Sequence, residues 1–77
     1  MNVKEYLVIA TPSEGWWSIV VPEVKGAISQ GRNEKEVEFM ATDVISLILE
    51  IPKSEISLKV EYRGHLSESI NRQGQNN

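Results

Sequence analysis

The sequence predicts a small α+β domain with the element order β-β-β-α-β, in which one helix packs across a sheet. Three observations lead to this fold class. Short apolar runs rich in β-branched and aromatic residues, separated by proline and glycine turns, fill the first part of the chain. A stretch with helical periodicity follows, and after it a segment alternates apolar and polar residues. We expect the first three strands to form an antiparallel meander.

The first two strands are predicted to form a hairpin. The first covers residues 6–11, Tyr-Leu-Val-Ile-Ala-Thr, and the residues 12–15 that follow, Pro-Ser-Glu-Gly, have turn chemistry throughout. The second covers residues 16–21 and stops at Pro22, which has no amide proton to donate to a strand ladder. The two strands are therefore expected to run antiparallel.

A third short strand is expected at residues 27–30, after a turn that begins at Pro22 and ends at Gly26. Gly31 closes this strand, and we expect it to supply a positive φ, which glycine adopts at no steric cost. We assign structural roles in turns to these three residues and to Gly15.

The helix is predicted to begin at Glu34. Asn33 is a good N-cap, and Glu36, three residues later, can reach back to the Asn33 amide as in a capping box. Pro52 marks the end of the helix. The apolar positions recur at spacings of three and four, which gives one face suited to a sheet: Val37, Met40, Ala41, Val44, Leu47, Ile48 and Ile51.

The last strand is predicted at residues 56–62, where apolar and polar residues alternate with the period of two of a half-buried strand. The domain then covers residues 1–64. Residues 65–77 form a polar tail, of which we expect about the last six to be disordered.

Length and composition favour a protein-binding module, and they are compatible with a reducing compartment. A chain of 77 residues has a small core, so we expect a homo-oligomer, either a dimer or a tetramer. The absence of cysteine excludes disulfides and cysteine-based zinc sites. Eleven acidic and eight basic residues give a net charge of −3, which disfavours direct binding to nucleic acid and favours a basic protein partner.

No apolar run reaches the length of a signal peptide or of a membrane-spanning helix. We therefore expect a cytoplasmic protein with no membrane association.

The adjacent Trp16 and Trp17 cannot both face the helix, because neighbouring strand residues point to opposite sides of a sheet. We place Trp17 with Ile19 and Val21 against the helix, and Trp16 with Val20 on the outer face. Two interpretations of Trp16 stay open. A loop or the tail partly covers it, or it contacts a subunit or another protein together with Val20, since exposed tryptophans often anchor interfaces.

The sequence contains no pattern of catalytic or metal-ligating residues. His65 is the only histidine, and no partner residues are placed beside it. The first three strands, as predicted, carry no carboxylate, which a metal-dependent nuclease would need on its sheet. We expect no enzymatic activity, no metal and no cofactor.

The segment from Gly15 to Val37 resembles the amino-terminal domain of HicB-like antitoxins. It shows an aromatic pair after a turn glycine, then Val-Pro-Glu-Val-Lys-Gly at residues 21–26, then a glycine before a capped helix. Ala27 stands where the family commonly has cysteine. The resemblance covers about residues 5–62 and implies a partial ribonuclease-H-like fold.

The same resemblance implies an antitoxin that binds a small basic ribonuclease toxin of the HicA type and occludes its catalytic site. Many relatives add a carboxy-terminal DNA-binding module, for which residues 64–77 are too few, so promoter binding by this chain is not expected. The alternative function is an orphan oligomeric scaffold, or a small-ligand-binding domain, with no toxin partner.

Overall fold

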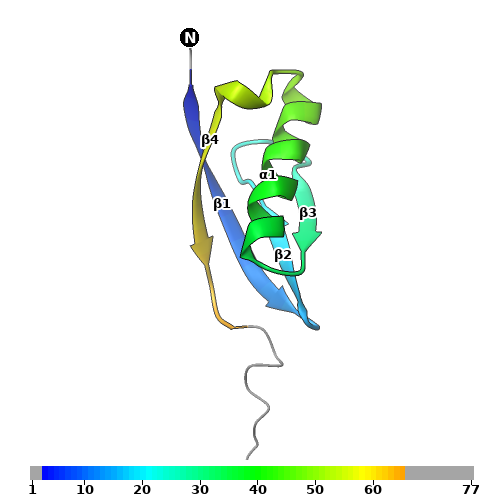
Figure 1. The fold of residues 1–77 in the computed structure, drawn as a ribbon. Coiled ribbons are helices and arrows are strands. Elements are labelled where there is room, and N and C mark those ends of the chain that lie inside the picture. The colour runs from blue at the N-terminus through cyan, green and yellow to red at the C-terminus, as the bar shows by residue number, and fades with distance from the viewer. Residues whose placement is uncertain (1–2, 66–77) are drawn as a thin grey trace, which may run out of the picture.

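The computed structural model describes residues 3–65 and contains four strands, one α-helix and one turn of 3-10 helix (Figure 1). The disorder expected for the end of the tail concerns residues outside this range. The elements in chain order are β1 (Lys4–Ser13), β2 (Trp16–Val20), β3 (Ile28–Gly31), α1 (Glu34–Leu49), η1 (Lys53–Glu55) and β4 (Ile56–Tyr62).

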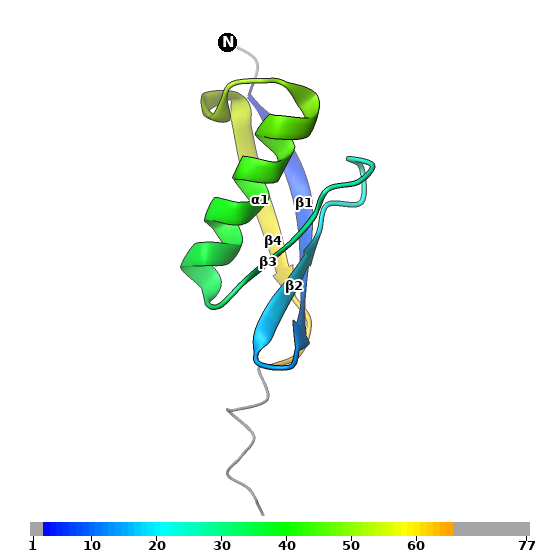
Figure 2. The same ribbon diagram turned by 90° about the vertical axis from the view of Figure 1, so that its right-hand side faces the viewer.

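The four strands form one mixed sheet in the order β3-β2-β1-β4. The predicted meander is confirmed, because β1 pairs antiparallel with β2 and β2 antiparallel with β3. The strand β4 pairs with β1 in parallel, from Lys4 opposite Ile56 to Ala10 opposite Tyr62. The chain reaches β4 through α1, which crosses one face of the sheet, and Figure 2 shows no described element on the other face.

The strand β1 extends two residues beyond its predicted end, so Pro12 lies inside it, opposite Trp17. Proline is tolerated there because pairing between β1 and β4 stops at Ala10, which leaves β1 with one neighbour at this point. A two-residue turn then joins β1 to β2. Its residues Glu14 and Gly15 both have positive φ, 53° and 86°, as a tight hairpin requires.

The core lies between the sheet and α1, and we call the sheet surface beneath the helix the covered face. Alternate residues of β1 and β2 point into it, and Val8 and Ile19 are fully buried. The helix contributes Val37, Ala41 and Ile45, each with no exposed surface. The remaining buried apolar side chains are Tyr6, Ala10, Trp17, Val21, Val24 and Ala27. Trp17 and Ile19 therefore face the helix, as the alternation predicts.

The start of α1 differs in two details from the predicted geometry. Asn33 Oδ1 accepts a hydrogen bond from Glu36 N at 2.9 Å, but Glu36 Oε1 accepts from the amide of Arg32 at 2.9 Å, one residue before the expected Asn33. The φ of Gly31 is not positive. Glycine is required there because a Cβ would lie 2.9 Å from the backbone nitrogen of Val37.

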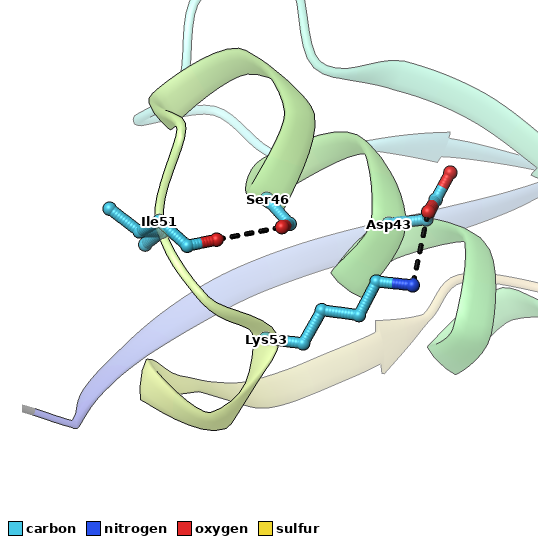
Figure 3. A network of polar contacts seen from close by, with 4 residues as sticks. All are labelled: Asp43, Ser46, Ile51 and Lys53. Carbon is cyan, nitrogen blue, oxygen red and sulfur yellow. Dashed lines mark hydrogen bonds and ion pairs between the residues drawn. The ribbon is translucent and has the colours of Figure 1, made fainter.

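The helix ends at Leu49, before the predicted boundary at Pro52. Glu50 adopts a left-handed conformation with φ of 58°, and its amide donates to the carbonyl of Ser46. The hydroxyl of Ser46 donates to the carbonyl of Ile51 at 2.7 Å, and Lys53 Nζ lies 3.2 Å from Asp43 Oδ1 (Figure 3). These contacts fix the direction in which the chain leaves α1 toward β4.

Candidate functional site

The face of the sheet opposite the helix, which we call the open face, carries apolar side chains from three strands. It is defined by Leu7 and Ile9 of β1, Trp16 and Val20 of β2 and Ile28 of β3. Strand register places Ile9 opposite Val20, and Val20 opposite Ile28. These three side chains therefore form a row across the sheet. Ile28 is 67% exposed and Val20 is 38% exposed, so the row is accessible in this chain.

Trp16 lies on the open face at the hairpin end, and Trp17 lies on the covered face. The guanidinium carbon of Arg32 sits 4.9 Å from the centre of the Trp16 ring, a cation–π contact that leaves Trp16 half-buried. Trp17 is 6% exposed and packs edge-on against Tyr62, with 4.9 Å between ring centres. Trp16 is therefore partly covered by a loop residue, because Arg32, between β3 and α1, lies over part of the ring.

Polar and charged groups surround the apolar row. Register places Thr11 opposite Ser18, and Ser18 opposite Gln30, in the row between Ile9 and the hairpin end. At the end of β4, Nη2 of Arg63, the residue after the strand, lies 3.0 Å from Oε1 of Glu61. An apolar centre with a polar, partly charged rim is the usual composition of a protein–protein contact surface.

The outer surface of α1 has a different character. The helix carries four acidic residues and one lysine, a formal charge of −3 that equals the charge of the whole chain. Phe39 is 61% exposed, and a second group of exposed apolar residues ends the helix, with Leu47 at 69% and Ile48 and Leu49 at 41% each. Lys53 Nζ lies 5.1 Å from the centre of the Phe39 ring while it also pairs with Asp43. The helix surface is therefore acidic, with exposed apolar side chains at Phe39 and at its carboxy-terminal end.

Two titratable groups in the described residues have a perturbed pKa. A hydrogen bond and the charge of Glu23, whose carboxylate is 2.8 Å from Lys4 Nζ, raise the pKa of Lys4. Partial burial, followed by the charges of Glu34 and Glu38, raises the pKa of Tyr62. Neither group lies on the open face. Lys4 is two residues before Tyr6 on β1 and Tyr62 is opposite Ala10, so both point to the covered face.

Within residues 3–65, no three His, Cys, Asp or Glu side chains gather closely enough to hold a metal ion. Neither helix of these residues, α1 or η1, is long and apolar enough to cross a bilayer. His65 is exposed at the end of the described chain.

Of the predicted contact residues, Trp16 and Val20 both lie on the open face, at opposite ends of β2. The predicted turn and cap residues lie elsewhere: Gly15 in the hairpin, Pro22 and Gly26 in the loop before β3, and Gly31, Asn33 and Glu36 at the start of α1.

Sequence reasoning missed Ile28, Ile9 and Leu7 as members of this face. Their apolar character was visible in the sequence, but the face to which Ile28 belongs depends on its register with Val20. A loop of unknown geometry sets that register, so residue type alone could not place the side chain.

No protein-family model matches the chain, and neither a curated protein nor a solved structure matches it significantly.

Proposed function

We propose that this chain is a HicB-like antitoxin of partial ribonuclease-H-like fold, which binds a small basic HicA-type ribonuclease in the cytoplasm and occludes its catalytic site. The proposal rests on the sequence resemblance between Gly15 and Val37 and on the element order β-β-β-α-β. In this role the chain acts by covering a surface and performs no reaction itself.

The observation that carries the proposal is the apolar row Ile9–Val20–Ile28 on the open face. Antiparallel strands with one wet face normally carry polar residues there. Contiguous exposed apolar side chains with a polar rim are typical of protein-binding surfaces. We therefore assign the toxin contact to the open face, with Trp16 and Ile28 as its anchors.

The free energies that the two surfaces can contribute favour the open face over the acidic helix as the main source of binding affinity. Full burial of an isoleucine or valine contributes about 1.5–3 kcal/mol. A solvent-exposed ion pair contributes about 0.2–1 kcal/mol. The apolar row therefore offers more binding energy than the acidic residues of α1, whose charge instead raises the rate of encounter with a basic protein.

The experiment is isothermal titration calorimetry of the purified chain with a HicA-type toxin made inactive by a substitution in its catalytic site. We compare Ile28→Ser with the matched control Leu47→Ser, because both residues are about equally exposed, at 67% and 69%, and lie on opposite sides of the molecule. Ile28→Ser is expected to weaken binding by about tenfold or more. Leu47→Ser is expected to change it less than about twofold.

A second assay separates occlusion from simple binding. RNA cleavage by the active toxin is measured with increasing amounts of wild-type chain, which should abolish cleavage near one equivalent per toxin site. Failure of the chain to bind any HicA-type toxin overturns the function, and the oligomeric scaffold is then the remaining role. A larger loss of affinity with Leu47→Ser than with Ile28→Ser overturns the choice of surface.

A further inference from the structure

The outer edge of β4 is the longer of the two sheet edges in the described part of the chain. The strand pairs with β1 on one side only, over the seven residues Ile56–Tyr62. The opposite edge is β3, which has four residues. An open edge presents unpaired backbone donors and acceptors that can pair with a strand of another chain.

The core is also incomplete at this edge. In Figure 1 the helix crosses the sheet with β3 on one side of it and β4 on the other, and no described element lies beyond β4. The β1 residues Tyr6 and Val8 are at most 5% exposed. Their partners on β4, Leu58 and Val60, share the same face but are only half-buried. Another strand placed against β4 would cover these side chains as well as the backbone.

Two copies of β4 can pair antiparallel so that the side chains opposite each other are complementary. An antiparallel pair of two copies centred on Val60 sets Lys59 opposite Glu61 of the second copy, and Glu61 opposite Lys59. It also sets Leu58 opposite Tyr62, both on the helix side of the sheet. Opposite charges directly across an antiparallel pair are stabilising, and apolar and aromatic partners add to this.

Antiparallel pairs of β4 centred on the neighbouring residues do not place opposite charges across from each other. A pair centred on Lys59 or on Glu61 sets that charge against the same charge of the second copy, which is destabilising. A pair centred on Leu58 sets Lys59 opposite Ser57 and leaves Glu61 without a basic partner across the edge. Registers centred between residues would set covered-face side chains opposite open-face side chains, which the pleat forbids.

We propose that the edge of β4 is the interface of a symmetric dimer with a second copy of this chain, paired antiparallel about Val60. The two sheets then form one continuous sheet, with both helices on the same face. The twofold axis makes the contact self-complementary and closes the assembly at two chains. This inference does not depend on the proposed antitoxin function.

The test is a pair of charge reversals examined by sedimentation velocity across a dilution series. In Lys59→Glu and in Glu61→Lys, both symmetry-related ion pairs become repulsive, so each variant alone should dimerise about tenfold more weakly than wild type. A mixture of the two variants should form a heterodimer of about wild-type affinity, because each of the two cross-axis pairs then joins one acidic and one basic side chain. The double swap of both residues in one chain should also restore the homodimer.

Matched controls are Lys35→Glu and Glu38→Lys, which make the same changes of charge at exposed positions on α1. They should leave the dimer unchanged. A monomeric wild-type chain, a dimer indifferent to the reversals, or single variants that do not prefer each other would each overturn the interface.

A cysteine variant locates the axis directly, since the native sequence has no cysteine. Val60→Cys should form a disulfide-linked dimer under mild oxidation, because Val60 lies opposite itself at the proposed axis. Ile28→Cys, on the open face, should not. Cross-linking of Ile28→Cys without cross-linking of Val60→Cys would contradict the β4 interface. None of these measurements needs a toxin, so their failure is separate from failure of the antitoxin assay.

Discussion

The two faces of the sheet are built from the same strands and differ in what covers them. On the covered face Val8, Ala10 and Ile19 are fully buried beneath the helix. On the open face Ile9, Val20 and Ile28 are equally apolar but keep accessible surface. Apolar residues on both faces of a strand are typical of sheets that are covered on both sides. This difference is what we expect if the fold uses one face and the proposed partner uses the other.

The largest effect that separates the two faces is expected from the adjacent residues Ile19 and Val20. Ile19→Ala should lower the free energy of unfolding by about 3–4 kcal/mol, because it leaves a cavity in the core. Val20→Ala should lower it by less than about 1 kcal/mol, because its side chain already contacts solvent. Urea denaturation followed by circular dichroism measures both, and equal losses would contradict the assignment of faces.

The junction between β3 and the helix offers the next contrast, again between neighbours. Gly31→Ala places a Cβ 2.9 Å from the backbone nitrogen of Val37 in the helix. This substitution should lower the free energy of unfolding by about 2 kcal/mol. Gln30→Ala, on the open face, should change stability by less than about 0.5 kcal/mol. The same denaturation assay applies. If Gly31→Ala is neutral, the close approach of Val37 does not constrain this position.

High pH should lower the free energy of unfolding through ionisation of Tyr62, whose side chain lies on the covered face. Its pKa is raised chiefly by partial burial, so the folded state holds the phenol proton more tightly than the unfolded chain does. Stability is then constant below about pH 10 and falls as the pH rises through the folded-state pKa. The hydrogen bond of Lys4 to Glu23, which raises the pKa of Lys4, acts in the same direction.

The corresponding measurement is the urea midpoint at about pH 7 and about pH 11 for wild type, Tyr62→Phe and Lys4→Met. Each variant should lose less stability over this interval than wild type does. An identical pH dependence in wild type and Tyr62→Phe would show that Tyr62 ionises as freely in the folded state as in the unfolded chain.

The smallest effect is expected at Arg32, which covers Trp16. Arg32→Ala removes an exposed cation–π contact that contributes about 0.5–1 kcal/mol. It should also make Trp16 more accessible to acrylamide, so fluorescence quenching increases while the buried Trp17 stays protected. Unchanged quenching would mean that Arg32 does not shield the ring in solution.

Most of the local structure could be predicted from the sequence, because each element depends on signals within a few residues. The turn at Gly15, the cap at Asn33 and the alternation at residues 56–62 are of this kind. The parallel pairing of β4 with β1 could not be predicted this way, since it depends on how α1 crosses the sheet.

The candidate site was predicted in part for the same reason. The period of two separates Trp16 from Trp17 within one strand, so one residue of the open face could be identified. Ile28 joins this face only through its pairing with Val20 across a loop. The role of Gly31 was also hidden, because it depends on the closeness of Val37 and Glu36 and not on the φ of the glycine itself.

The most direct test of the account is methyl nuclear magnetic resonance of the chain as a HicA-type toxin is added. We expect the largest shift changes at the methyl groups of Ile9, Val20 and Ile28, small changes at the buried Ile19, and none at Leu47 on the helix. Shift changes concentrated at Leu47, with the methyl groups of the open face unmoved, would contradict the claim that this face takes the partner.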